Sequence, residues 1–521
     1  MKSLVFLVFA CSFARAQFPN ILISSQLEPK GVSIAINPKN ATQIIAGAGM
    51  ANAYYSEDSG NSWKKNDNIC EAFNLYGQPI VFWDTARKAY FTDLAFLNPN
   101  VVTDGSWVDR VIVNRSENFG KSYTNCEDFG KNGKRVQYRH FACVDQKTNV
   151  IHVTWTQFSK FESGKVGDSS IIRHSKSLDG GKRWTDPKIL STFIGDCKNG
   201  DSTVMGATPC MGPDGSIYVS WAGPKGLVFQ KSWNDGGSWM PQEKIILPLK
   251  NGWSYKVNGL YKANGLPGIA CDLSKGAFKG RIYICWSDEK NGVKNKDVFL
   301  TYSDDKGENW VDPVLITYHP NHKEQFMPVM TIDQSTGYIY ILYYDQQNFQ
   351  DEGLTDVSLA ISKNGGLKFD IYKVNEKSFK PLKDGSFGDY ISVSAVNSIV
   401  RPIWMQQDKK KELNVYTAMI DEPALQKYNA TKNADLELEK SVKFSEQVKI
   451  NFSLKSPMEI TAVVSKPLEP DFEKVVIKNK KFKAGNNTML INSKELGLQK
   501  GSYILTLYYN NKNTFTWITE E

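Results

Sequence analysis

An eight-residue pattern recurs six times between residues 56 and 369, and it constrains the fold more than any other feature of this 521-residue chain. The first copy is "SEDSGNSW", which begins at Ser56. The other copies are "SENFGKSY", "SLDGGKRW", "SWNDGGSW", "SDDKGENW" and "SKNGGLKF", which begin at Ser116, Ser177, Ser232, Ser303 and Ser362. Recurrence at intervals of roughly sixty residues indicates a fold built from repeated units.

Short apolar runs precede each octet in the same order. In the fourth unit these runs are "TPCMGPDG", "SIYVSW" and "LVFQKS", and the fifth and sixth units follow the same plan. Runs of alternating apolar residues bounded by Gly, Asp and Asn predict strands in antiparallel meanders. A unit of four short strands forms one blade of a propeller, and the blades repeat around a central axis.

The octet itself is predicted to join the third strand of each blade to the fourth. Its Ser and Asp side chains can bind amides of the turn, its Gly supplies a positive φ, and its aromatic residue packs between sheets. Asn118, Asn234 and Asn364 replace the acid in three copies. Asparagine keeps the carbonyl acceptor and loses the charge, so the octet is predicted to be scaffold rather than a catalytic centre.

These octets resemble Asp-boxes, and the chain therefore resembles the sialidase-like, BNR-repeat β-propellers over about residues 50 to 370. A seventh unit without an octet begins at Gly388, and its missing fourth strand is predicted to be "NILIS" near the N-terminus. The resulting fold class is all-β: a seven-bladed propeller, with six blades as the alternative, followed by a small C-terminal β-sandwich.

The two ends of the chain differ from the repeats. Residues 1–16, "MKSLVFLVFACSFARA", have the pattern of a signal peptide, which predicts a secreted or cell-surface protein. The propeller is expected over 17–420, a polar, loop-like linker over 421–440, and the sandwich over 441–521. The run "KAGNNTMLINSKELGLQKGSYILTLYYNN" resembles the C-terminal sorting domains of exported Bacteroidetes proteins, which implies attachment at the cell surface. A plain accessory or glycan-binding sandwich is the alternative.

Composition narrows the possible partners. The net charge of +8 is spread along the chain without a long Lys/Arg run, so no nucleic-acid partner is predicted. No later apolar run is long enough for a transmembrane segment. The cysteine and histidine spacings predict no metal site and no cofactor, although the loop "YYDQQNFQDEGLTD" could hold calcium instead of being a solvated loop. The seven cysteines after the signal are odd in number, so at least one is unpaired, and Cys197 could pair with Cys210.

A ligand is expected on the rim of the propeller opposite the octets. The side chains predicted there are aromatic residues, carboxylates and two arginines, which suit a glycan or polysaccharide. They are Asp93, Tyr138, Arg139, His140, Trp286, Asp288, Tyr344, Asp345, Asp389, Tyr390 and Arg401.

The family resemblance implies three arginines that bind the substrate carboxylate and a tyrosine nucleophile that a glutamate activates. It also implies an aspartate that protonates the leaving group. The first inner strand, "KGVSIAINP", has no arginine, and only Arg139 and Arg401 are expected at the channel mouth. Asp389 with Tyr390 and Tyr344 with Asp345 are the candidate catalytic pairs, and the other residues are assigned to substrate binding. Two functions follow: a glycoside hydrolase with a non-standard residue set, or a non-catalytic propeller that binds glycan or protein.

Overall fold

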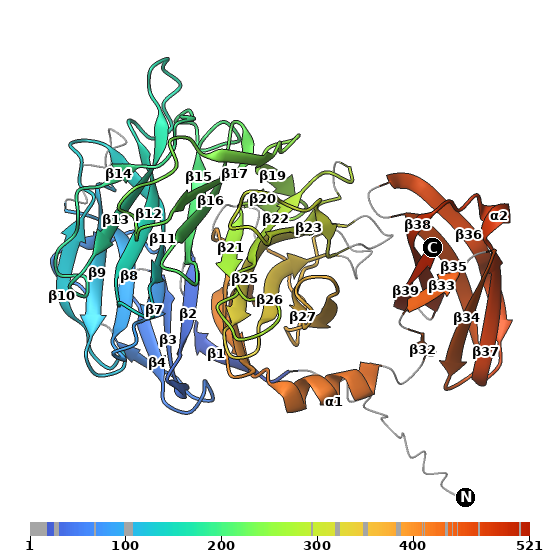
Figure 1. The fold of residues 1–521 in the computed structure, drawn as a ribbon. Coiled ribbons are helices and arrows are strands. Elements are labelled where there is room, and N and C mark those ends of the chain that lie inside the picture. The colour runs from blue at the N-terminus through green and yellow to red at the C-terminus, as the bar shows by residue number, and fades with distance from the viewer. Residues whose placement is uncertain are drawn as a thin grey trace, which may run out of the picture. The chain divides into compact units, whose positions relative to one another are not determined.

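The computed structural model describes residues 18–25, 31–49, 51–66, 69–97, 108–292, 295–317, 323–346, 353–381, 387–408, 410, 412–432, 436–439, 441–444, 446–466, 469–509 and 512–520. The chain divides into two compact units. Among the described residues, the propeller unit comprises those in 19–421 and 469–471, and the C-terminal unit comprises Phe18 and those in 422–466 and 472–520. The predicted signal peptide, residues 1–16, lies outside the described residues. Figure 1 shows both units, which are almost entirely strands.

Seven antiparallel sheets of four or more strands make up the described part of the propeller unit. The first is β2 (Val32–Asn37), β3 (Asn40–Ala48), β4 (Ala53–Ser56) and β5 (Lys64–Asn66), and the second is β6 (Asn74–Leu75), β7 (Ile80–Trp83), β8 (Ala89–Phe96), β9 (Arg110–Ser116) and β10 (Thr124–Phe129). The third is β11 (Val136–Val144), β12 (Ile151–Phe158), β13 (Ser170–Ser177) and β14 (Lys188–Ile189), and the fourth is β15 (Met205–Met211), β16 (Ile217–Gly223), β17 (Gly226–Ser232) and β18 (Lys244–Leu247).

The remaining sheets of this unit follow the same meander. The fifth is β21 (Gly268–Cys271), β22 (Ile282–Asp288), β23 (Asp297–Ser303) and β24 (Val314–Leu315), and the sixth is β25 (Gln325–Asp333), β26 (Tyr338–Asp345), β27 (Asp356–Ser362) and β28 (Asp370–Lys373). The last is β29 (Ser392–Val396), β30 (Ile399–Gln407), β31 (Leu413–Ala418) and β1 (Asn20–Ser24). A separate hairpin, β19 (Ser254–Val257) and β20 (Leu260–Asn264), lies in sequence between the fourth and fifth sheets.

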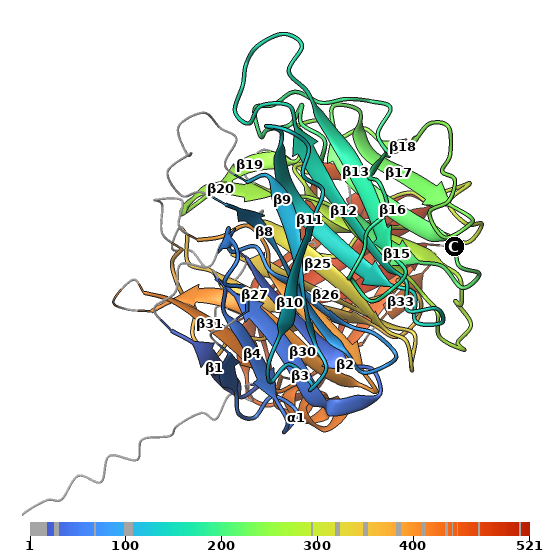
Figure 2. The ribbon, with the colours of Figure 1, turned by 90° about the vertical axis from the view of Figure 1, so that its left-hand side faces the viewer.

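The sheets close into a ring. The innermost strands contact one another in the order β2, β7, β11, β15, β21, β25 and β29, and β29 contacts β2 again. The third and fourth sheets lie side by side in Figure 2. Strand β1 pairs antiparallel with β31, as predicted for "NILIS", so both ends of this unit share one sheet.

The octets hold the ends of the third strands, as predicted. In every copy the Ser hydroxyl accepts the N–H of the octet glycine at 2.8–3.0 Å. The acid or Asn at the third position accepts a second N–H of the turn, and Asn118 does so at 2.9 Å just as Asp58 does. The octet glycines have positive φ, for example +87° at Gly307. Since Asn makes the same bonds as Asp, the octet is architectural.

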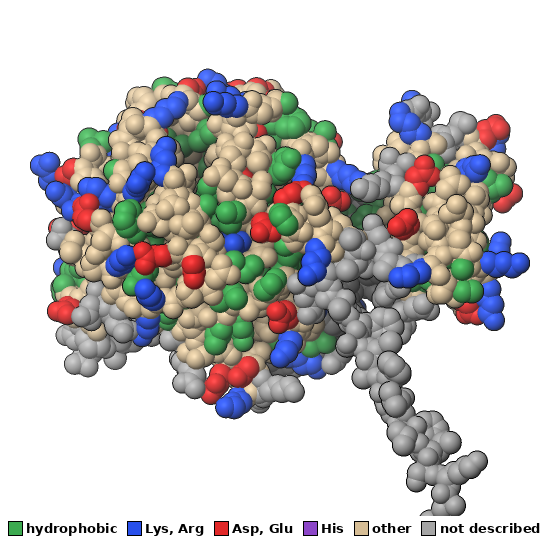
Figure 3. Space-filling view, turned by 90° about the horizontal axis from the view of Figure 1, so that it is seen from below, with side chains coloured by type: hydrophobic (Ala, Val, Ile, Leu, Met, Phe, Trp, Pro, Cys, Tyr) green, Lys and Arg blue, Asp and Glu red, His purple; other side chains and the backbone are tan. Residues whose placement is uncertain are grey.

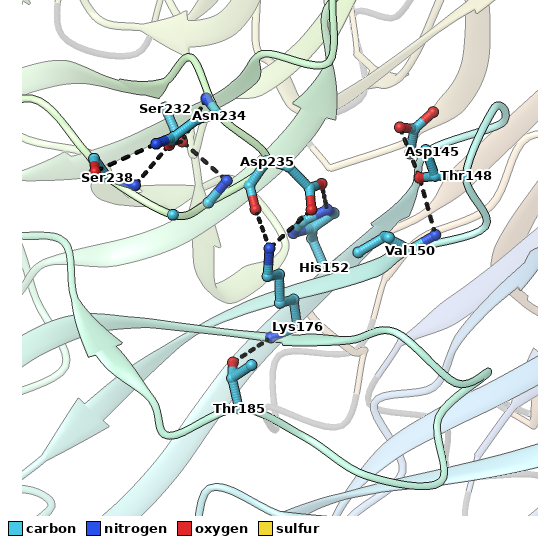
Figure 4. A network of polar contacts seen from close by, with 12 residues as sticks. Asp145, Thr148, Val150, His152, Lys176, Thr185, Ser232, Asn234, Asp235 and Ser238 are labelled. Atoms are coloured by element: carbon cyan, nitrogen blue, oxygen red, sulfur yellow. Dashed lines mark hydrogen bonds and ion pairs between the residues drawn. The ribbon is translucent and has the colours of Figure 1, made fainter.

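Each octet also packs on the preceding sheet. A Cβ on Gly307 would lie 2.3 Å from the ring of Phe229 in β17, so only glycine fits there. In the fourth octet, Asp235 contacts His152 Nε2 at 3.0 Å and Lys176 Nζ at 2.8 Å, both from the third sheet (Figure 4). These contacts fasten one sheet to the next.

One disulfide, Cys70–Cys126, forms within the described residues. Cys197 and Cys210, which the sequence suggested as a pair, are both free thiols. Cys197 is buried in a core cluster formed by residues of the second, third and fourth sheets, whereas Cys210 packs against the cluster between the fourth and fifth.

The C-terminal unit is a sandwich of two sheets. One is β32 (Leu436–Leu438), β34 (Gln447–Leu454) and β37 (Gly485–Asn492), and the other is β33 (Ser441–Phe444), β39 (Lys512–Glu520), β38 (Gly501–Tyr509), β35 (Met458–Lys466) and β36 (Glu469–Phe482). Alternate residues of β34 and β38, among them Val448, Ile450 and Leu505, form its core. A short helix, α2 (Ser493–Leu496), follows β37.

The segment expected to be a loop-like linker is partly helical. Helix α1 (Glu422–Lys432) begins directly after the propeller unit. Its Leu425 is buried, and Tyr428 stacks on Phe18 with ring centroids 5.1 Å apart. The prediction relied on the polarity of the segment and neglected good helix formers in "EPALQK".

Candidate functional site

The candidate site lies where the innermost strands begin, on the rim opposite the octets. Strand β11 carries a bulge there, because its pairing with β12 shifts between Tyr138 and Phe141. Arg139 occupies this bulge with φ +45°, a left-handed conformation that costs a non-glycine residue on the order of 1–3 kcal/mol. The bulge leaves Arg139 6% exposed, and its guanidinium lines a pocket.

Arg139 meets Asp389 in this pocket. Its Nη2 lies 3.2 Å from Asp389 Oδ2, and Asp389 remains about one-third exposed. Gln78 Nε2 donates to the same carboxylate oxygen at 3.2 Å, and Asn264 Nδ2 donates to the main-chain oxygen of Asp389 at 2.8 Å. Arg139 Nε and Gln78 Oε1 are buried, and neither has a hydrogen-bond partner among the described residues.

The pocket is partly open, and the space of about 270 Å³ at this position includes solvent at its mouth. Its lining residues are Tyr138, Arg139, Asn199, Trp253, Lys262, Ala263, Asn264 and Asp389. Lys262 donates to the main-chain oxygen of Asn199, and its Nζ lies 5.7 Å from the ring centroid of Trp253. Burial and the nearby positive charge of Arg139 lower the pKa of Lys262. The lining thus has two cationic side chains and one carboxylate.

Three more of the predicted residues lie behind the pocket and support it. Asp93 is fully buried and accepts the N–H groups of Gly77, Gln78 and Leu94, which fixes the segment that carries Gln78. The hydroxyl of Tyr390 donates to Pro79 O at 3.3 Å, directly before the inner strand β7.

His140 also belongs to this support. Its Nε2 lies 2.8 Å from Thr92 Oγ1, and burial lowers its pKa to about 3. The ring is therefore neutral at physiological pH, and it packs the base of the site without adding charge.

The other predicted residues do not join the pocket. Tyr344 is buried among phenylalanines and donates to Met405 O at 3.0 Å. Asp345 is buried and accepts the Ser358 hydroxyl at 2.8 Å. Neither side chain reaches solvent, so the proposed Tyr344–Asp345 pair is not a surface-accessible couple in this structure.

The structure does not place Trp286 and Asp288 in the pocket either. Trp286 is 1% exposed and stacks on Phe299, and Trp155, Trp221 and Trp404 occupy fully buried positions in the second strands of other sheets. Trp286 is thus a repeated core residue. Asp288, at the end of the same strand, is 5% exposed, and burial raises its pKa.

Arg401 lies on the octet rim of the propeller, opposite the pocket, and not at the channel mouth where it was expected. Its Nε donates to Ser59 O of the first octet at 2.7 Å, and its Nη1 donates to Ile420 O at 3.0 Å. The residue is near the start of β30, where second strands begin on the octet side, and it fastens the last sheet to the first. Its role is therefore closure of the ring.

The hairpin β19–β20 was missed from the sequence. It supplies Lys262, Ala263 and Asn264, and Trp253 directly precedes it. The available signal was the interval from Ser232 to Ser303, which is the longest between successive octets. Extra residues inserted after the fourth strand of a blade reach the rim opposite the octets.

No metal cluster is visible in the described ranges: no three His, Cys, Asp or Glu side chains converge there. Much of the predicted calcium loop, residues 347–352, lies outside the described residues. Over the same described portion of the chain, no helix is long and apolar enough to cross a membrane. Basic and acidic side chains are interspersed on the face drawn in Figure 3.

Comparison with known proteins found no matching protein-family model and no matching curated protein. Several solved structures are similar at low sequence identity. A PL25 ulvan lyase has a TM-score of 0.44 and 13% identity, covering 78% of this chain and 96% of that chain. The Hadza microbial sialidase Hz136 has a TM-score of 0.43 and 12% identity, covering 74% of each chain. A Trypanosoma rangeli sialidase has a TM-score of 0.42 and 11% identity, covering 95% of this chain and 89% of that chain.

Proposed function

We propose that this protein is an exported propeller that binds glycans and that its pocket takes an acidic sugar. The observation that carries the proposal is the guanidinium of Arg139, which is nine-tenths buried, pairs with Asp389 through Nη2 and keeps Nε unpaired. A carboxylate or sulfate oxygen would satisfy this donor, and charge-assisted bonds to Arg are among the stronger hydrogen bonds in proteins. Lys262 adds a second positive charge to the same wall.

The rest of the pocket suits a sugar hydroxyl. The buried Oε1 of Gln78 is an acceptor without a donor among the described residues, and Asn199 and Asn264 supply further polar groups. The pocket is small and opens to solvent, so we infer that it takes the end of a glycan chain rather than an internal stretch of polysaccharide.

Binding is better supported than hydrolysis. Most glycosidases need two carboxyl groups about 5–10 Å apart around the scissile bond. Asp389 is the single carboxylate among the described lining residues, and the hydroxyl of neighbouring Tyr390 is bonded to a main-chain oxygen. The sialidase-like hydrolase predicted from the sequence is therefore the second candidate, and the following experiment separates the two.

Isothermal titration of the full chain should compare sialyllactose with lactose, which differ by one acidic sugar. We expect sialyllactose to bind at least about tenfold more tightly, a difference of about 1.4 kcal/mol. Lys262→Met should remove about tenfold or more of this affinity, since a hydrogen bond to a charged group contributes about 1.5–3 kcal/mol.

Lys225→Met is the matched control. Lys225 Nζ also lies 5.7 Å from an aromatic centroid, that of Phe193, but it is not part of the pocket lining. Equal affinity for both sugars, or equal losses in both variants, would contradict the proposal. If wild type releases free sialic acid from sialyllactose and Asp389→Asn does not, the protein is a hydrolase rather than a binding protein.

A further inference from the structure

The longest strand of the C-terminal unit carries a concentrated positive charge. Strand β36 and the residue after it contain Lys474, Lys478, Lys480, Lys481 and Lys483, with no acidic residue between the first and the last. All five lysines are exposed. Strand β36 forms the edge of its sheet as described, since β35 is its one neighbour there.

Few of these charges are paired, although Glu469, Asp471 and Glu473 precede them in the same strand. Lys481 Nζ lies 3.6 Å from Glu459 Oε1, but both side chains are exposed, and such pairs contribute about 0–1 kcal/mol. The other four lysines make no ion pair with any described residue. Isolated charges suffice to protect a sheet edge from aggregation, whereas clustered like charges repel one another. The density of lysines therefore exceeds what edge protection requires.

The geometry of a strand gives this charge a linear form. At about 3.3 Å per residue, the segment from Lys474 to Lys483 extends for roughly 30 Å. A single small anion would contact one or two of these ammonium groups, whereas an extended chain with regularly spaced negative charges would contact those that lie on one face of the strand.

We propose that the edge strand β36 is a second binding surface, for a linear acidic polysaccharide that carries sulfate or carboxylate groups along its chain. This surface is distinct from the pocket around Arg139, because its five lysines belong to the C-terminal unit and none of them lines the pocket.

The aromatic residues of β36 favour a polysaccharide over nucleic acid. Single-stranded nucleic acids bind by stacking bases on exposed rings. Phe472 and Phe482 are instead partly buried against the core, and Lys474 and Lys480 lie 5.9 Å and 5.4 Å from their ring centroids. The rings of this strand are therefore not exposed for stacking by a base, and ammonium groups lie next to them instead.

The test compares two triple variants of the full chain. The β36 variant replaces Lys478, Lys480 and Lys483 by Gln and so removes three charges from the surface. The control variant replaces Lys449, Lys455 and Lys500 by Gln at exposed positions elsewhere in the same unit. Binding to dextran sulfate, with unmodified dextran as the uncharged match, is measured at low and at physiological salt.

We expect wild type to bind dextran sulfate and not dextran, with affinity that falls steeply as salt rises. The β36 variant should lose about tenfold or more in affinity, the control variant less than about twofold. Equal losses in both variants would overturn the proposal, as would tighter binding of oligothymidylate or of anionic phospholipid vesicles than of dextran sulfate. Sialyllactose binding should be unchanged in the β36 variant, so failure here and failure of the pocket proposal are distinguishable.

Discussion

Removal of one octet hydroxyl should destabilise the propeller unit measurably. Ser303 is 1% exposed, and its Oγ accepts the N–H of Gly307 at 2.8 Å while it donates to Asp305 Oδ1 at 2.8 Å. In Ser303→Ala the buried N–H of Gly307 loses its partner, which costs about 1–3 kcal/mol. The lost bond to the exposed Asp305 adds little, so we expect unfolding to require about 2 kcal/mol less.

Asp305→Asn is the matched variant. Asparagine keeps the oxygen that accepts the N–H of Asn309 at 2.8 Å, and Asn118 and Asn234 already fill this position in other octets. We expect its free energy of unfolding to fall by less than about 0.5 kcal/mol, as is usual for surface substitutions.

Urea unfolding followed by tryptophan fluorescence provides the measurement. Of the 13 tryptophans, only Trp517 belongs to the C-terminal unit, so the signal reports on the propeller. The reasoning would be refuted by an unchanged midpoint in Ser303→Ala together with a large loss in Asp305→Asn. That result would mean that the carboxylate charge, and not the turn geometry, is what the octet provides.

Three further predictions follow from buried or paired groups. His140 has a pKa of about 3 in the folded protein against 6.5 ordinarily, so the unfolded chain is protonated first as pH falls. This difference should lower the free energy of unfolding by about 2 kcal/mol between about pH 7 and pH 5. Urea unfolding of His140→Gln should show a correspondingly flatter pH dependence, and curves parallel to those of wild type would contradict the prediction. Asp389→Asn should raise the affinity for sialyllactose severalfold in calorimetry, because Asp389 competes with the ligand for Arg139, and a loss of binding would count against this competition. Replacement of Cys70 and Cys126 by Ala should lower stability by up to about 4 kcal/mol, because the disulfide closes a loop with a sequence separation of 56; a midpoint of urea unfolding within error of wild type would contradict this.

The repeated fold could be predicted because its determinants are local. Alternating apolar runs, turn residues and the octet bonds each lie within a few residues of sequence, and even the closing strand Asn20–Ser24 has the pattern of a strand. Helix α1 was missed because the prediction weighed the polarity of the segment above its good helix formers, and because contacts such as the Phe18–Tyr428 stack join residues far apart in sequence.

The site was predictable only in part. Tyr138, Arg139 and Asp389 line one pocket, which agrees with strand positions that follow from the repeat, and their roles in binding or catalysis stay predictions. Lys262 and Asn264 were missed, since they belong to an inserted hairpin that has no counterpart among the repeats. A position-by-position comparison of the units would have identified Trp286 as a core residue.

The side chains of Arg401 and Tyr344 show a further limit. Both have the chemistry of a ligand site, yet main-chain oxygens take up their donors: Ser59 O for Arg401 and Met405 O for Tyr344. Whether a polar side chain serves the scaffold or a ligand depends on partners far away in sequence, which residue type and strand position do not specify.

Hydrogen–deuterium exchange of the full chain with and without sialyllactose tests most directly whether the octets are scaffold and the opposite rim is the ligand site. The account predicts slower exchange on ligand addition in the segments around Tyr138–His140, Asn199, Trp253–Asn264 and Asp389. Exchange in octets such as Ser177–Trp184 and Ser303–Trp310 should stay unchanged. Protection concentrated in the octets, with none around Arg139, would contradict it.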